Sequence, residues 1–383
     1  MSIFRRAELA AQMTRQLLHP GVLDEGLRSG LFISGLRRTG KTTFLVNDLI
    51  PALEAAGALV IYVDLWTNTQ LSPVVLVHAA IRKALTELQT PASAVLKKLE
   101  RLGSADVGAF GMKFGFKIEN VGEVGGLTIA QALTEVVDQA KTDLVLIIDE
   151  VQHAITSDDG KNLMFSIKAA RDAINPRPGT PGHLMFIGTG SHRALVSELT
   201  ARRNQAFEGA TSIAYPVLDA DYVDHLFDRL ISEGSGLLPS RAVAISAFRM
   251  LGNRPEELIR ALGVLRSKLL PGGSPDDYLP VIAATLRSAV ADVELSKLDS
   301  LGSLAAAIFE RIAMADGDAK GLFSVAAAAE YSKFIGREVR VEEVQMVVND
   351  IMAANLIMRR AHGLYCITDP LVQEIWRERR LPF

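Results

Sequence analysis

The stretch Gly-Leu-Arg-Arg-Thr-Gly-Lys-Thr at residues 35–42 decides the fold of this chain. It matches the phosphate-binding loop pattern, a glycine and four free positions followed by Gly-Lys-Ser/Thr. The apolar residues Leu31–Ser34 precede it, and a helical pattern starting at Thr42 follows it. Glycines let backbone N–H groups turn inward around phosphate oxygens, and the N-terminus of the helix adds partial positive charge. The sequence therefore predicts a strand, a nucleotide-binding loop and a helix in succession.

Two side chains of this loop carry the predicted chemistry. We expect Lys41 to reach the outer phosphates and the Thr42 hydroxyl to bind Mg²⁺. Arg37 and Arg38 are better suited to contacting carboxylates or phosphate than to catalysis. The predicted nucleotide contacts of the loop and the first helical turn are Gly35, Arg38, Thr39, Gly40, Lys41, Thr42 and Thr43.

A second strong pattern is the apolar run at residues 144–148, which ends in Asp149 and Glu150. Such a run is typical of a buried strand, and ligands of open α/β sheets bind at the carboxyl ends of the strands. We expect Asp149 to hold the Mg²⁺ shell, directly or through water, and Glu150 to orient and polarise the water that attacks the γ-phosphate. A solvated acidic turn after a strand is the weaker alternative, because the phosphate-binding loop lies upstream.

Polar residues also follow the apolar run at residues 184–188. Thr189 is the first choice, and Ser191 the second, for a hydrogen bond to the attacking water or the γ-phosphate. The alternative is a helix N-cap, a position that Ser191 suits.

Arginines at three further positions are candidates for the nucleotide site. Arg254, at the start of a predicted helix, can fold over the nucleotide and couple lid position to phosphate occupancy. A surface arginine is the alternative there. Arg202 and Arg203 can reach the γ-phosphate of a neighbouring subunit, but a solvated helix end is the slightly better interpretation.

Short strands alternate with helical patterns from residue 31 to about 218, which predicts an α/β fold: a P-loop NTPase parallel sheet covered by helices on both faces. The expected strands are 31–34, 59–64, 144–149, 184–188 and 212–215. The expected helices include about 5–18, 42–56, 72–88 and 127–140. The expected domains are the ATPase core with its N-terminal helix at 1–218, a helical lid at 219–295 and a winged-helix domain at 296–383.

The winged-helix prediction rests on the order of elements after residue 300. Three helical patterns, a hairpin around His362 and Gly363, and a closing helix follow one another at 304–315, 324–335, 341–355, 356–367 and 371–379. Winged helices often bind DNA through the third helix, but residues 341–352 contain three acidic residues and no lysine or arginine. DNA phosphates would repel this helix. Weak backbone contacts remain open to Arg337, Arg340, Arg359 and Arg360.

One insertion has no assigned chemistry. Residues 109–118 alternate glycines and aromatic or apolar residues in a way that suits a strand or hairpin. A small hairpin lying on the core is the favoured interpretation, and an edge for binding a partner is the other.

Composition excludes several classes of protein. A net charge of −3 over 383 residues gives no global basic field for nucleic acid or membrane. The single cysteine, Cys366, excludes an intramolecular disulfide and a cysteine-built metal site. No run approaches the roughly 18 uninterrupted apolar residues of a membrane span, and the N-terminus lacks the pattern of a signal peptide. A cytoplasmic protein is therefore expected.

The chain resembles AAA+ ATPases, in particular the signal-transduction (STAND), archaeal-ATPase-like branch. The resemblance lies in the loop at 35–43, the Ile-Ile-Asp-Glu strand end followed by Val151 and Gln152, the turn at 188–191 and the Gly-Asn-Arg-Pro segment at 252–255. It implies ATP and Mg²⁺ binding, slow or partner-gated hydrolysis, and nucleotide-controlled movement of the lid and winged helix. No arginine-finger position is clearly marked, so ring assembly with shared sites does not follow.

The predicted function is an ATP-hydrolysing molecular switch whose nucleotide state controls a contact with a protein partner or a second copy. The alternative is an AAA+ ATPase that acts on DNA, of the replication-initiator or transposition-helper type. A small-molecule kinase is a third class, for which the sequence offers no substrate pocket. The choice of ATP over GTP rests on the resemblance, because no base-reading motif is visible.

Overall fold

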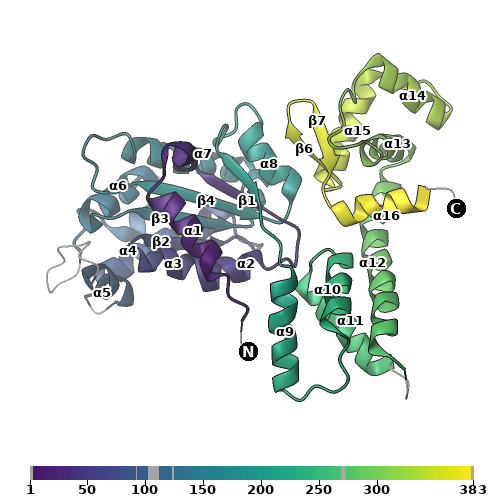
Figure 1. Ribbon diagram of the computed structural model, residues 1–383. Helices are drawn as coiled ribbons and strands as arrows, with labels where there is room; N and C mark the ends of the chain where they lie inside the picture. The colour runs from purple at the N-terminus through teal and green to yellow at the C-terminus, as the bar shows by residue number, and fades with distance from the viewer. Residues whose placement is uncertain (1–2, 92, 102–111, 123–124, 269–272, 381–383) are drawn as a thin grey trace.

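The computed structural model describes residues 3–91, 93–101, 112–122, 125–268 and 273–380. Three parts follow one another along the chain: a sheet covered by helices, a group of helices, and a C-terminal part that carries a small hairpin (Figure 1). The second and third parts both lie at the same end of the sheet.

The first part is built on five parallel strands in the order β2-β3-β4-β1-β5. They are β1 (Leu31–Ser34), β2 (Leu59–Asp64), β3 (Leu144–Asp149), β4 (Leu184–Gly190) and β5 (Thr211–Ala214). The predicted α/β parallel sheet is confirmed. β4 runs two residues past its predicted end because Gly190 pairs with Ser34, and β5 lies one residue earlier than predicted.

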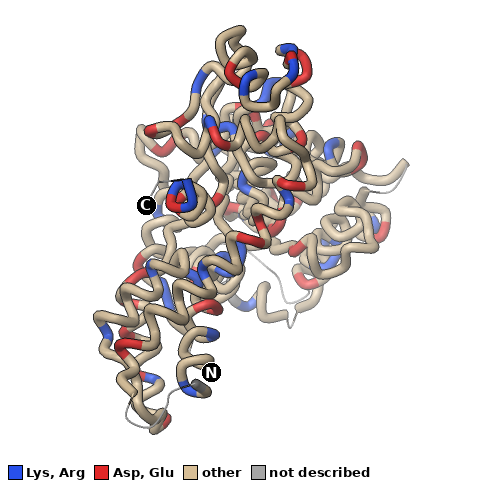
Figure 2. The backbone as a smooth tube through the Cα atoms, turned by 90° about the vertical axis from the view of Figure 1, so that its right-hand side faces the viewer, with Lys and Arg blue, Asp and Glu red and all other residues tan. Residues whose placement is uncertain are grey.

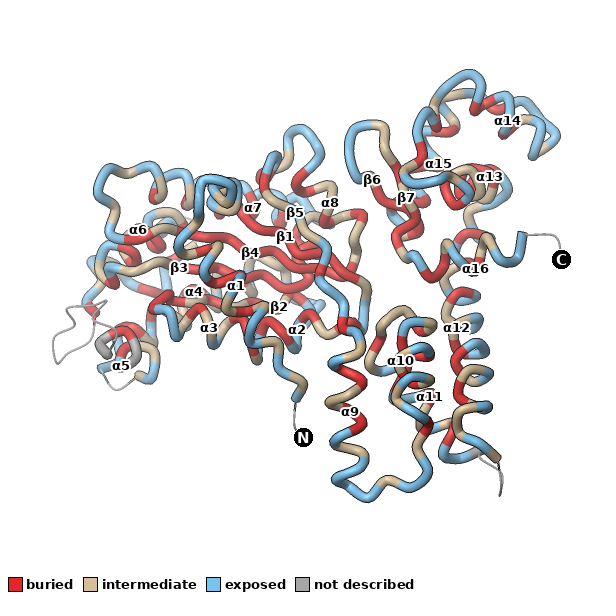
Figure 3. The backbone as a smooth tube through the Cα atoms, in the orientation of Figure 1, coloured by how far each residue is buried: buried red, intermediate tan, exposed pale blue. Residues whose placement is uncertain are grey.

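Helices cover both faces of this sheet because its central strands are buried on both sides (Figure 3). Leu146 and Ile148 belong to one apolar cluster, whereas Val145 and Ile147 belong to another. The first cluster includes residues of α4 (Pro73–Gln89), α6 (Ile129–Ala140) and α7 (Asp158–Ile174). The second includes residues of α1 (Ala7–Leu18), α2 (Lys41–Phe44) and α3 (Ile50–Ala55). This alternation follows from the two-residue period of a strand.

The helix predicted at 42–56 begins one residue earlier and contains a wider, π-helical turn at Leu45–Leu49. Pro51 has no N–H group for the carbonyl of Asn47, which disrupts regular helical bonding. The Arg5 guanidinium donates to that carbonyl instead and also pairs with Asp48 at 2.6 Å. The segment before α1 is thereby attached to the helix that starts in the phosphate loop.

The hairpin predicted at 109–118 is not formed in the described part of that segment, and residues 109–111 lie outside the described residues. The Met112 N–H donates to the Leu88 carbonyl at 3.0 Å, and Gln139 donates to the Lys113 carbonyl at 2.8 Å. Backbone groups that a second strand would satisfy are therefore bonded to helices. Phe114 and Phe116 stack on each other and pack against the core.

The second part contains α9 (Ala220–Ser232), α10 (Arg241–Met250), α11 (Pro255–Lys268) and α12 (Pro275–Ser300). It follows α8 (Arg193–Ala201) and β5 of the first part. Helix α12 continues through residue 295, so the expected boundary between the second and third parts falls within one helix.

The third part contains α13 (Ser303–Ala313), α14 (Val325–Ile335), α15 (Val341–Ala353), the strands β6 (Ile357–Ala361) and β7 (Leu364–Ile367), and α16 (Pro370–Arg380). These are the elements predicted from the sequence, in the predicted order, and β6 pairs with β7 in antiparallel fashion. Within the described residues, no helix has both the length and the apolar character needed to cross a membrane.

Substitutions at two glycines in different helices test the packing of α7. A Cβ on Gly160 would lie 1.8 Å from the backbone oxygen of Ala154, whereas a Cβ on Gly263 in α11 would meet nothing within 4 Å. Gly160→Ala should lower the free energy of unfolding by about 1–3 kcal/mol through overpacking. Gly263→Ala should raise it by about 0.5–1 kcal/mol, because alanine is the better helix former. Denaturant unfolding measures both, and equal shifts would contradict this packing.

Candidate nucleotide-binding site

The phosphate loop lies between the end of β1 and the start of α2. Gly40 precedes α2 in a left-handed conformation with φ of 91°, which favours glycine. A Cβ on Gly35 would lie 2.9 Å from Cβ of Tyr215, so a side chain has no room there. The Thr39 hydroxyl donates to the Leu36 carbonyl at 2.8 Å, which closes the loop on itself. The sequence pattern therefore has its expected structural setting of strand, loop and helix.

Lys41 is buried and lies inside this loop. Its Nζ donates to the carbonyls of Gly35 at 2.8 Å and Leu36 at 2.9 Å. Burial lowers the pKa of Lys41, and the nearby carboxylates of Glu150 and Asp149 partly oppose that shift. The ammonium group thus sits among backbone oxygens with two carboxylates nearby, where phosphate oxygens are favourable ligands.

Asp149 joins the ends of four elements. Its Oδ2 accepts a hydrogen bond from the Thr42 hydroxyl at 2.6 Å, and its Oδ1 accepts one from Thr189. The Tyr62 hydroxyl at 3.4 Å from Oδ2 is a further donor, which the sequence did not single out. Burial and the Asp149 charge raise the pKa of Tyr62, so its hydroxyl stays protonated as a donor.

Glu150 follows in a left-handed conformation, with φ of 55°. Its Oε2 accepts hydrogen bonds from the Ser191 hydroxyl at 2.8 Å and the Ser191 N–H at 3.2 Å. The structure therefore brings Ser191 to Glu150 and Thr189 to Asp149. The residue that caps α8 is His192, whose Nδ1 accepts from the Leu195 N–H at 3.3 Å, so the N-cap alternative for Ser191 is wrong.

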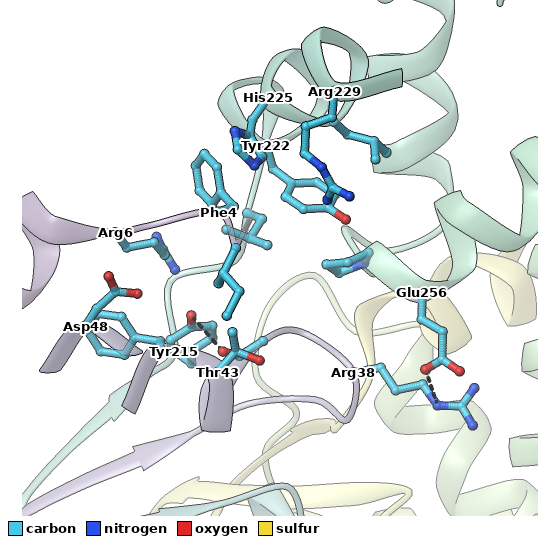
Figure 4. Close-up of a pocket in the computed structure, with 16 residues that line it drawn as sticks. Phe4, Arg6, Arg38, Thr43, Asp48, Tyr215, Tyr222, His225, Arg229 and Glu256 are labelled. Carbon is cyan, nitrogen blue, oxygen red and sulfur yellow. Dashed lines mark hydrogen bonds and ion pairs between the residues drawn. The ribbon is translucent and has the colours of Figure 1, made fainter. Parts of the chain in front are cut away.

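A cavity of about 360 Å³ opens beside the phosphate loop (Figure 4). Phe4 lies against Tyr222 and His225 of α9, with ring centroids 5.8 and 5.4 Å apart. The Arg6 guanidinium lies 5.2 Å from the ring centroid of Tyr215, and Thr43 also lines the space. Sequence reasoning missed these aromatic residues, since they come from the N-terminal segment, the residue after β5, and α9, which only the fold brings together.

Arg38 and Arg254 both take part in contacts with other parts of the chain. Arg38 turns toward α11, where it pairs with Glu256 at 3.1 Å and Glu257 at 3.2 Å. Arg254 is buried in an ion pair with Asp369, the residue before α16, and its Nε has no hydrogen-bond partner. In this structure Arg254 therefore contacts the C-terminal part.

The start of α8 contacts the same C-terminal segment. Arg193 donates to the Thr368 carbonyl, and its buried Nε has no hydrogen-bond partner. His192 Nε2 lies 3.0 Å from the Ala353 carbonyl. Because Nδ1 of this ring accepts from Leu195, Nε2 carries the proton, and burial lowers the pKa of His192 toward that neutral form. Two arginines, from α8 and from the start of α11, thus contact consecutive residues of the third part.

The remaining candidate arginines lie at the surface. Arg202 directly follows α8 and lies 3.8 Å from Glu198, and Arg203 is exposed beside it. In the third part, Arg337 pairs with Glu343 and Arg360 with Asp318. Basic and acidic residues are interspersed over the backbone of the molecule (Figure 2).

Comparison with known proteins places this site within a family. Residues 18–261 match the model of a family described as an ATPase domain predominantly from Archaea. None of the curated proteins compared with this sequence matches it significantly.

Similarity to solved structures extends over nearly the whole chain. The Aeropyrum pernix ORC2 protein in its ADPNP–ADP complexes is 13% identical, with a TM-score of 0.49 and coverage of 99% of this chain and 95% of that one. The Aeropyrum pernix ORC1 protein in complex with DNA is 15% identical, with a TM-score of 0.41 and coverage of 99% and 94%. Cdc6p from Pyrobaculum aerophilum is 13% identical, with a TM-score of 0.40 and coverage of 99% and 96%.

These TM-scores lie below 0.5, so the family assignment rests on the sequence match. That match covers well over half of the chain and includes the phosphate loop, the acidic end of β3 and Arg254. The chain belongs to this family of predominantly archaeal ATPase domains and is an ATPase.

Proposed function

We propose that this ATPase is a molecular switch in which the bound nucleotide sets the position of the second and third parts relative to the core. The observation that carries the proposal is the contact of Arg193 and Arg254 with Thr368 and Asp369. Both guanidinium groups keep a buried Nε without a partner. Buried donors without acceptors are costly, and phosphate oxygens are strong acceptors for guanidinium groups.

The proposed domains are the core at 1–218, a lid at 219–295 and a winged-helix domain at 296–383. Helix α12 crosses the second boundary and so connects the lid to the winged helix. Arg287 of α12 pairs with Glu374 at 3.1 Å and Glu378 at 2.8 Å, and Arg379 of α16 pairs with Asp292 at 2.6 Å. These pairs fasten α16 along α12.

The residues at the loop suit a nucleotide with Mg²⁺. Thr42 Oγ1 and Asp149 Oδ2 supply two oxygens 2.6 Å apart, and oxygen is the ligand that Mg²⁺ prefers. Among the described residues no cluster of three His, Cys, Asp or Glu side chains could hold a metal by itself. Mg²⁺ usually takes one or two carboxylates and completes its shell with substrate phosphates and water. When bound, it would neutralise charge that develops on the phosphates.

The other roles follow from position. On nucleotide binding, Lys41 would give up its hydrogen bonds to the loop carbonyls and bind the outer phosphates instead. Gly35, Thr39 and Gly40 would shape the loop around these phosphates. The cavity beside Thr43 offers aromatic walls for the base. Glu150 would orient the attacking water, and Thr189 would hold Asp149 in place. Arg38 would link the loop to the lid through Glu256 and Glu257.

The proposed cycle uses competition for Arg254. Without nucleotide, Asp369 neutralises this buried guanidinium. ATP adds negative charge beside the loop, draws Arg193 and Arg254 toward it and releases the C-terminal part to meet a protein partner or a second copy. Hydrolysis, assisted by Glu150, removes the γ-phosphate and restores the contact.

Action on DNA is the alternative function. The charges of α15 do not favour it, because its residues include Glu342, Glu343 and Asp350 and no lysine or arginine. Arg337 is already paired with Glu343. Turnover stimulated by duplex DNA, with a stimulation that fades as salt rises, would support the alternative over the switch.

The ATPase site is tested with Glu150→Gln. This variant should bind ATP as the wild type does. It should hydrolyse ATP at least about 100-fold more slowly, because the group that polarises water is lost. Lys41→Ala should instead lose ATP binding, since the phosphate contact is removed. Binding is measured by calorimetry and turnover by phosphate release. Wild-type turnover in Glu150→Gln would remove Glu150 from the mechanism, and normal ATP binding by Lys41→Ala would overturn the site.

The switch is tested with Asp369→Asn in the Glu150→Gln background. Loss of the carboxylate charge leaves the buried guanidinium of Arg254 without a counter-charge, so the nucleotide-free protein should melt at a lower temperature and ATP should bind about 10-fold more tightly. Asp292→Asn is the matched control, because its pair with Arg379 is exposed and worth little. ATP binding that is unchanged or weaker in Asp369→Asn would contradict competition for Arg254.

A further inference from the structure

The amide of Gln152 lies against the carboxylate proposed to activate water. Gln152 is 4% exposed in the 3₁₀ turn that follows Glu150 (Val151–Thr156), and its Nε2 donates to Oε2 of Glu150. The Ser191 hydroxyl and N–H donate to that same oxygen. Three donors therefore converge on one oxygen of Glu150. Among the described residues, none donates a hydrogen bond to the other oxygen of Glu150, Oε1.

The other end of the Gln152 amide is left unsatisfied. Its Oε1 is buried and has no hydrogen-bond partner. A buried acceptor without a donor costs free energy, so burial of this side chain is not explained by its own hydrogen bonding. If this side chain only filled space, an apolar side chain would stabilise the fold more. What the amide does provide is a donor to a carboxylate.

The chain makes room for this amide at Gly190. A Cβ on Gly190 would lie 2.2 Å from Oε1 of Gln152 and 2.6 Å from Cγ2 of Val196. The Gln152 amide thus packs directly against the backbone of Gly190 at the end of β4, where a side chain would not fit. The carbonyl of Gly190 also accepts the Gly35 N–H at 3.1 Å, so the same residue connects Gln152 to the phosphate loop.

We propose that Gln152 is a positioning residue for ATP hydrolysis: with Ser191 it holds Oε2 of Glu150, so that Oε1 remains available to orient the attacking water. The inference rests on the proposed role of Glu150. Loss of the amide should loosen the hold on this carboxylate.

The test is Gln152→Met, which nearly preserves volume and removes the donor. Turnover of ATP should fall by about 10- to 100-fold, the range expected for a lost hydrogen bond to a charged group, while ATP affinity stays unchanged. Gln345→Ala, at an exposed position of α15, is the control and should match the wild type. Ser191→Ala removes another donor to the same oxygen and should show the same signature if Gln152→Met folds poorly.

A double variant separates positioning from structure. In the Glu150→Gln background, Gln152→Met should cause no further loss in single-turnover rate, because Gln152 acts through Glu150. An equal loss in both backgrounds, or a loss that follows ATP affinity, would overturn the inference, and so would wild-type turnover in Gln152→Met. Wild-type turnover in Glu150→Gln would instead mean that the proposed role of Glu150 has failed.

Discussion

The hydrogen-bonded carboxylate of Asp149 is the constraint on which the rest of the site depends. It stands at the carboxyl end of β3 and accepts from Thr42 at the start of α2 and from Thr189 in β4. Tyr62 of β2 and the N–H of Glu150 add further donors. A buried carboxylate needs such donors, because burial of a charge without compensating hydrogen bonds costs free energy. The same bonds fix the ends of three neighbouring strands relative to the phosphate loop.

The parts beyond the sheet are held by charges of two kinds. Exposed pairs, such as Arg379 with Asp292, contribute little individually to stability. The pair of Arg254 with Asp369 is buried, so removing one partner leaves an uncompensated charge. A contact of this kind is sensitive to a competing anion in a way that an apolar interface is not. This difference makes the junction between core, lid and C-terminal part suitable for a nucleotide-dependent change.

Local patterns were enough to predict much of this structure. The phosphate loop, the bounds of β1, β2 and β3, and the helix–hairpin order of the third part depend on short-range periodicity and turn chemistry, which the sequence displays directly. The π-helical turn at Leu45–Leu49 depends on Pro51 together with Arg5, which lies 46 positions before Pro51 in the chain. The aromatic cavity, Tyr62 and the contact of Arg254 with Asp369 could not be predicted, because they depend on which strands and helices meet in space. Gln152 was visible in the sequence, but its contact with Glu150 depends on a bare Gly190 opposite.

The most direct measurement is the distance between the core and the C-terminal part as a function of nucleotide. Spin labels at Lys161→Cys in α7 and Lys333→Cys in α14, with the native Cys366 replaced by serine, report it by pulsed electron resonance. In the Glu150→Gln background, the account predicts one short distance without nucleotide and a longer one at saturating ATP, because the ion pair between Arg254 and Asp369 breaks when ATP binds. An identical distance distribution with and without ATP, in protein shown to bind it, would contradict the switch.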